Sequence, residues 1–228
     1  MLTIKNERAR GVLRYLIPLI IIPVLIALGA IVFKGKRYLL ISLGVVVLSL
    51  VLFITGFEER KTGSRRMVII SVMVALCVVG RFIPFFKPIT AITVITAIYL
   101  GGEAGFLTGA LAALISNFYF GQGPWTPFQM FAWGMVGLIA GLLSAPLKKS
   151  KIFLGIFGVL AGLVYSGMMD IWTVLSVNGT FSWQMYLGLL STALPHTILY
   201  CVTNVVFLIL FSGPFGRKLE RVKIKYGV

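Results

Sequence analysis

Eight apolar runs follow one another along this chain, and short polar, basic or glycine-rich segments separate them. Most runs are about 20 residues long, which is the length that a helix needs to cross a bilayer. They lack the short alternating segments of a membrane β-barrel. The pattern therefore predicts an all-α polytopic membrane protein with helices at about residues 13–33, 38–57, 67–86, 88–101, 103–120, 127–147, 152–177 and 183–212.

Composition supports the same class of protein. The chain has 228 residues, is 59% hydrophobic and carries six acidic against 21 basic residues. A soluble domain of this length has too little interior for that much apolar surface. The net charge of +15 does not indicate nucleic-acid binding, because nearly all Lys and Arg flank the apolar runs, where topology and contact with the lipid bilayer account for them.

The basic segments predict the orientation. Basic tails at both ends of the chain and the segments 58–66 and 148–151 fall on one side of an eight-helix arrangement. The positive-inside rule places that side in the cytoplasm, so both termini are expected there, in a multi-pass plasma-membrane protein. The basic turn at 34–37 is the exception, because this arrangement places it outside.

The charged segment 58–66 is also the best candidate boundary in the chain. The two apolar runs before it carry almost no polar residues, whereas the six after it carry many. We therefore expect a two-helix membrane extension with a charged linker at residues 1–66. A six-helix core with a basic C-terminal tail is expected at residues 67–228.

Polar and aromatic residues gather at those ends of the core helices that the orientation places outside. A one-sided cluster of flat aromatic faces and amide groups suits a pocket for an organic solute. An interfacial aromatic belt is the alternative for the tryptophans. The candidate substrate-binding residues are Arg81, Asn117, Gln122, Trp125, Gln129, Trp133, Asp170, Trp172 and His196.

Two of these candidates, Asp170 and His196, allow two interpretations each. Asp170 is the only acid within such a run, and a carboxylate at membrane depth indicates a functional site by default. An ion pair with Arg81, at similar depth, is the alternative. His196 is the only histidine of the chain, and it is either a ligand contact or a hydrogen-bonded residue of the bundle.

Small residues recur at the spacing that brings helix backbones close together. The pairs in residues 101–109, 137–141 and 158–162 indicate packing inside the bundle. Ser71 and Ala75 differ because they lie in the cytoplasmic half of the first core helix, where a small face could dock a partner helix. We name them as the candidate partner-docking residues.

Several motifs of enzymes are missing. The sequence has no HExxH zinc pair, no Walker A loop and no Cys–His or Ser–His pairing. Cys77 and Cys201 lie inside apolar runs, as small packing residues do. We therefore expect no catalytic residues, no metal site and no intrinsic cofactor.

Residues 67–212 resemble the substrate-binding S component of energy-coupling factor (ECF) vitamin transporters, and the cobalamin-type members most. The resemblance rests on the pair Ser71 and Ala75 and on the stretches GGEAGFLTGALAALISN, FGQGPWTPFQMFAWGMVGLIAGLL and YSGMMDIWT. It covers the six-helix core. The two helices before the core depart from the usual six.

The resemblance implies a protein that is not itself an enzyme. Such a component binds a vitamin, here cobalamin or a precursor, at its outer face. It docks through its first core helix on a transmembrane coupling subunit, and two cytoplasmic ATPases, the only subunits that bind ATP, drive uptake. The rival hypotheses are an S component for another vitamin, a membrane-embedded enzyme that acts on a lipid or isoprenoid through Arg81, Asp170 and His196, and a self-sufficient channel or carrier.

Overall fold

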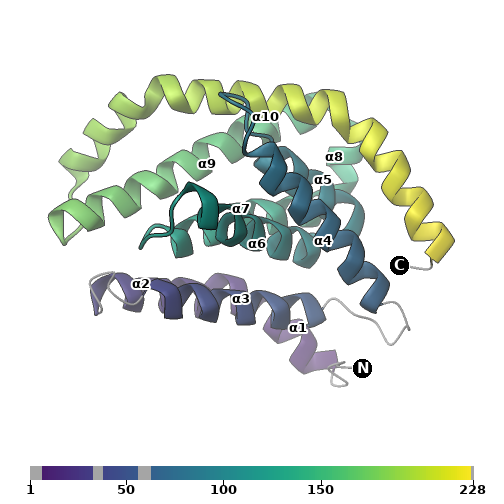
Figure 1. Cartoon of the computed structure of the whole chain (residues 1–228), viewed down its shortest axis with the longest axis horizontal. Coiled ribbons are helices and arrows are strands. Elements are labelled where there is room, and N and C mark those ends of the chain that lie inside the picture. Colours follow the sequence, from purple (N-terminus) through teal and green to yellow (C-terminus); the bar gives the residue numbers. More distant parts are fainter. Residues whose placement is uncertain (1–6, 33–37, 56–62, 227–228) are drawn as a thin grey trace.

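The computed structural model describes residues 7–32, 38–55 and 63–226, and every regular element in these segments is a helix (Figure 1). This confirms the all-α class. The elements are α1 (Glu7–Leu16), a π-helical turn η1 (Ile17–Ile21), α2 (Ile22–Ile31), α3 (Tyr38–Thr55), α4 (Gly63–Gly80), α5 (Ile89–Leu100), α6 (Gly102–Phe120), α7 (Thr126–Leu142), α8 (Ser144–Lys149), α9 (Lys151–Asn178) and α10 (Trp183–Tyr226).

Within the described segments, three helical stretches are long and apolar enough to cross a bilayer: Arg8–Ala30, Lys151–Asn178 and Trp183–Lys225. Three shorter apolar helices accompany them, at Leu39–Thr55, Ile89–Leu100 and Thr126–Leu142. These lengths agree with a multi-pass membrane protein. The number of crossings and their orientation stay predictions, and the basic turn at 34–37 and most of the charged linker lie outside the described residues.

Prolines bend helices in this chain without ending them. Pro18 and Pro23 stand in or next to η1, so α1, η1 and α2 form one continuous helical stretch. Local π-helical adjustments are one way in which membrane helices tolerate proline, because they re-satisfy the freed backbone groups. α10 runs through Pro195 and Pro214 to Tyr226, whereas the sequence pattern places the end of the last apolar run near residue 212. The basic C-terminal tail is therefore largely helical.

Glycines bring α6 and α7 into backbone contact. A Cβ atom on Gly109 would lie 2.6 Å from the carbonyl carbon of Trp133, and one on Gly137 would lie 2.5 Å from the carbonyl carbon of Gly105. α9 and α10 pack in the same way, where Asn204 Nδ2 donates to the Gly158 carbonyl at 3.3 Å. The predicted packing role of the small residues is thus confirmed for these helix pairs.

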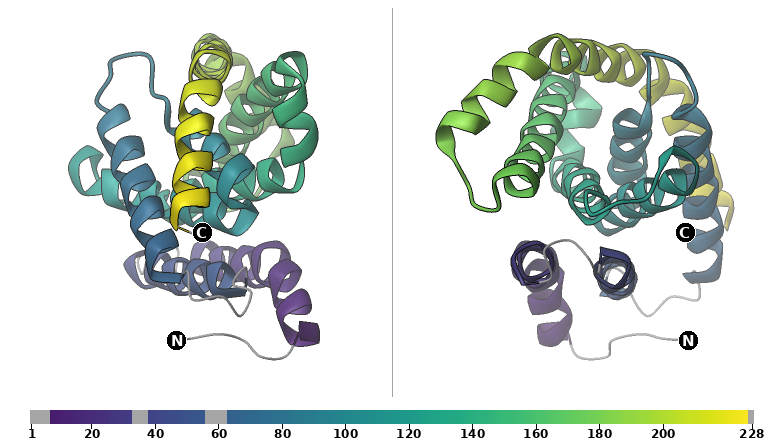
Figure 2. Two further views of the ribbon diagram at one scale, coloured as in Figure 1. Left: turned by 90° about the vertical axis from the view of Figure 1, so that its right-hand side faces the viewer. Right: turned by 60° about the vertical axis from the view of Figure 1, so that its left-hand side comes forward.

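The first three helices form a layer against α6 and α7 (Figures 1 and 2). Ile41 and Val45 of α3 are buried in one apolar cluster with Phe106 of α6 and Phe128 of α7. The N-terminal extension therefore shares a hydrophobic core with the rest of the chain.

Contacts between distant segments show which helix ends lie together. At one end, Phe82 after α4 packs on Tyr119 and Phe120 at the end of α6, with ring centroids 4.6 and 5.0 Å away. At the other end, the Lys148 ammonium lies 4.6 Å from the Tyr99 ring and 3.9 Å from the Glu220 carboxylate. We call these the aromatic end and the basic end of the bundle.

Candidate ligand-binding site

A hydrogen-bonded polar network begins at Arg81, the residue directly after α4. Its Nη1 donates to Ser116 Oγ and to Asn117 Oδ1, both at 2.6 Å. Ser116 and Asn117 are fully buried in the last turn of α6. Because Asn117 has no access to water, its amide must find partners within the protein.

Asn117 finds those partners on α7. Its Nδ2 donates to Gln129 Oε1 at 2.8 Å and to Thr126 Oγ1 at 2.9 Å. Thr126 in turn donates to Gln122 Oε1 at 3.0 Å, and Gln129 Nε2 donates to the Tyr165 hydroxyl on α9 at 3.2 Å. The loop between α6 and α7 and the start of α7 are therefore tied to α4, α6 and α9 by side-chain amides.

Aromatic rings form the floor of this network. Trp133 and Tyr165 stack with their centroids 4.7 Å apart and their planes 10° apart. Trp133 Nε1 donates to the Tyr200 hydroxyl at 2.9 Å, and this hydroxyl also shares a hydrogen bond with Thr90 Oγ1. We define the polar cluster as Arg81, Thr90, Ser116, Asn117, Thr126, Gln129, Trp133, Tyr165 and Tyr200.

Positive charge lies on the aromatic side of the cluster. The Arg81 guanidinium carbon is 4.6 Å from the Phe120 ring centroid and 5.7 Å from that of Trp133. Lys87 Nζ lies 5.9 Å from the same Phe120 ring. Cation–π contacts of this kind hold a guanidinium against ring faces.

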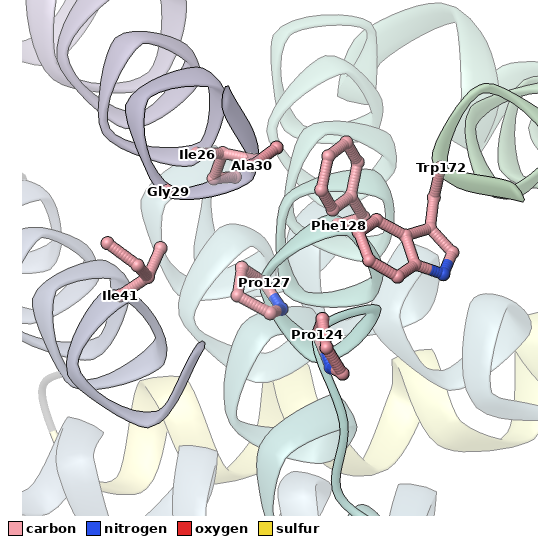
Figure 3. A pocket seen from close by; sticks show the side chains of 8 residues that line it. All are labelled: Ile26, Gly29, Ala30, Ile41, Pro124, Pro127, Phe128 and Trp172. Carbon is pink, nitrogen blue, oxygen red and sulfur yellow. The ribbon is translucent and has the colours of Figure 1, made fainter. Parts of the chain in front are cut away.

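An outer hollow of about 830 Å³ adjoins the loop between α6 and α7. Its walls come from Ala30 of α2, from Pro124 and Trp125 of the loop, and from the end of α9 within residues 172–179. A cavity of about 10 Å³ lies beside it, where α2 and α3 meet Pro127 and Phe128 (Figure 3). Both spaces share Ala30, Pro124 and Trp172 in their linings.

The family model described as "ECF-type riboflavin transporter, S component" matches residues 61–219. The chain belongs to this family of S components. No curated protein matches the chain, and no solved structure does. The match confirms the ECF resemblance and makes the chain a component of a transporter and not an enzyme. It names riboflavin, so the cobalamin-type likeness expected from the sequence has no support.

The fold of this S component brings four of the predicted binding residues into the polar cluster: Arg81, Asn117, Gln129 and Trp133. Gln122 lies at its edge, where it accepts from Thr126. Trp125 and Trp172 instead line the outer hollow. Their role in binding stays a prediction.

Asp170 and His196 lie apart from the cluster. Among the described residues Asp170 forms no ion pair with Arg81, and its Oδ2 is buried without a hydrogen-bond partner. The predicted Asp170–Arg81 pair is therefore absent from this structure, because Arg81 is directed to α6. His196 is exposed on α10, because the buried face of that helix carries Thr197 and Tyr200.

Sequence reasoning missed the hydroxyl groups of the cluster. Tyr165, Tyr200 and Thr90 lie within apolar runs, where single hydroxyl residues are common and carry little signal. The spacing of Tyr165 and Trp172 could have revealed one of them. Seven residues apart on α9, the two share a helix face, and Trp172 was already a candidate.

The predicted docking face of α4 is open. Ser71 and Ala75 are exposed, and so are Val68, Val72 and Val79, at 64%, 54% and 66%. Within the described residues no other helix covers this stripe. The described segments also hold no group of three or more residues suited to a metal, and Cys77 and Cys201 are free and buried.

Proposed function

We propose that this chain is the substrate-binding S component of an ECF-type importer for riboflavin, located in the plasma membrane. The observation that carries the proposal is the family match over residues 61–219, whose description names riboflavin. This match covers α4 to α9 and α10 as far as residue 219, so it includes every residue of the polar cluster.

The chemistry of the cluster supports a flavin as the ligand. Riboflavin has a flat three-ring system whose polar edge both donates and accepts hydrogen bonds, together with a chain of hydroxyl groups. Trp133 and Tyr165 offer flat ring faces, and Asn117 and Gln129 offer amides that can donate and accept. A site of aromatic faces with a few placed polar groups is the usual form of a small-molecule pocket.

The family implies that vitamin binding and ATP-driven transport reside in different subunits. In this proposal the S component binds the vitamin at the aromatic end of the bundle. Its α4 face, with Ser71 and Ala75, contacts a transmembrane coupling subunit, and two cytoplasmic ATPases drive uptake. The exposure of this apolar stripe supports such a contact, because small residues let a partner helix approach closely.

Titration of riboflavin into the purified protein tests the proposal. Flavin fluorescence should be quenched as the ring stacks on aromatic side chains, with a Kd below about 1 µM. Cobalamin, the first ligand expected from the sequence, is titrated in parallel, although no finding here favours it over riboflavin. Tight binding of cobalamin without binding of riboflavin would reassign the ligand. Binding of neither would leave the family role without its proposed substrate.

A further inference from the structure

The N-terminal extension supplies a wall of the outer hollow. Ala30, near the end of α2, lines this space opposite Pro124 and Trp172. The family match begins only at residue 61, so this wall comes from a part of the chain that the family does not describe. The extension thus reaches the ligand side of the bundle.

Close packing fixes the extension in that position. A Cβ atom on Gly29 would lie 2.7 Å from Ile41 Cγ1, so α2 and α3 leave no room between them at this level. Ile26 and Ile41 are buried and face Pro127 and Phe128 across a space of only about 10 Å³ (Figure 3). The wall is therefore a packed part of the fold.

The lining of the hollow indicates what it can hold. Trp125 and Trp172 provide ring faces, and Thr173, Ser176 and Asn178 provide hydrogen-bonding groups. None of the described residues that line it is charged. These residues suit a neutral ring system that carries polar substituents, and among them an anion or a cation finds no charged partner.

The hollow and the polar cluster both use side chains of α9. Trp172 lines the hollow and Tyr165 belongs to the cluster, and the seven residues between them correspond to about 10 Å of helix. The loop that carries Pro124 and Trp125 also carries Gln122, which accepts a hydrogen bond from Thr126 of the cluster. A solute in the hollow thus lies against the loop that closes the cluster.

We propose that the outer hollow is an entry site that first holds a neutral aromatic solute, and that α2 of the N-terminal extension is one of its working walls. This inference rests on the proposed function for the identity of the solute, riboflavin. The position of α2 beside the hollow does not depend on the identity of the solute.

Two matched positions on α2 test the wall. Ala30→Cys places a thiol in the hollow, whereas Leu28→Cys places one at an exposed position on the opposite side of the same helix. In lipid nanodiscs a charged thiol reagent should label Ala30→Cys quickly and Leu28→Cys slowly, because the reagent needs water at the thiol. The parent protein, with buried Cys77 and Cys201, gives the background. Riboflavin should slow labelling of Ala30→Cys by about fivefold or more through occlusion.

A second pair tests the effect on binding. Ala30→Trp projects a large side chain into the hollow and should weaken riboflavin binding by about tenfold, while Leu28→Trp should leave the affinity within about twofold. Equal labelling of the two cysteine variants, absence of riboflavin protection in a protein that binds it, or equal affinity of the two tryptophan variants would each overturn the inference. If the parent binds no riboflavin, the proposed function fails, and the two labelling rates alone decide whether α2 walls an open hollow.

Discussion

Arg14 of α1 forms an ion pair with Glu103 at the start of α6. The Glu103 side chain is 3% exposed and that of Arg14 is 43% exposed, so the carboxylate is buried and its partner reaches it from the surface. Beside them Arg66 of α4 donates to the Leu100 carbonyl. This pair joins the N-terminal extension to the core at the basic end, opposite the hollow that Ala30 lines.

Replacing Glu103 by Gln should lower the free energy of unfolding by about 1–3 kcal/mol, because the charge of Arg14 then loses its partner in a partly buried place. Thermal or denaturant unfolding in detergent measures the change. Combining it with Arg14→Gln closes a double-mutant cycle. If the losses of stability in the two single variants simply add in the double variant, the ion pair does not stabilise the packing of the N-terminal extension on the core.

Gly109→Ala should destabilise the bundle by about 1–3 kcal/mol, because the new methyl group would meet the backbone of Trp133 and force α6 and α7 apart. Gly188→Ala is the matched control. A Cβ atom there meets nothing within 4 Å, so the alanine should stabilise α10 by up to about 1 kcal/mol. Unfolding of both variants under one set of conditions gives the comparison, and effects of the same sign would contradict the packing described for α6.

Trp133→Phe should weaken riboflavin binding by about fivefold, because the ring face remains but the hydrogen bond to Tyr200 is lost, a change of about 1 kcal/mol. The flavin titration measures it. Trp183→Phe removes an indole that is 68% exposed and should not change the affinity. Equal affinities of both variants and the parent would place the ligand elsewhere.

Ala75→Trp should abolish vitamin uptake in cells and leave binding to the purified protein unchanged, because the indole blocks approach of a partner helix at the far side of α4 from the cluster. Ile198→Trp, at a position of α10 that is 54% exposed, is the control and should permit uptake. Loss of binding together with uptake would assign Ala75 to internal packing.

A topology experiment checks the orientation expected from the basic residues. Asn178→Cys, at the exposed last residue of α9, should react with an impermeant reagent in intact cells. Lys149→Cys, at the exposed last residue of α8, should react only after the membrane is opened. The reverse labelling pattern would show the opposite orientation in the membrane.

The sequence predicted the helical class and four of the nine residues of the polar cluster for physical reasons. Arg81, Asn117 and Gln129 stand out because polar side chains in apolar runs need partners, and the ends of neighbouring helices are the places where such partners meet. The family match is the firmer evidence for function, and its description names riboflavin where the sequence suggested cobalamin.

What the sequence could not give is the rotation of each helix about its axis. In a membrane the interior of the bundle and the lipid are both apolar, so an apolar pattern does not say which face is buried. His196 and Tyr200 lie one turn apart on α10, yet His196 is exposed and Tyr200 is buried. For the same reason, the sequence could not predict which face of α3 packs on α6.

The Asn117 amide already has a partner for each of its roles: it accepts from Arg81 and donates to Thr126 and Gln129. A solute that binds among these groups must exchange hydrogen bonds with them and cannot simply add its own. Each exchange of hydrogen bonds adds little binding free energy. An analogue that breaks one of these hydrogen bonds without forming a new one leaves a buried amide unpaired, at a cost of about 1–3 kcal/mol. In the proposed binding mode, the amides of this S component discriminate against close analogues, while the ring faces of Trp133 and Tyr165 supply most of the attraction.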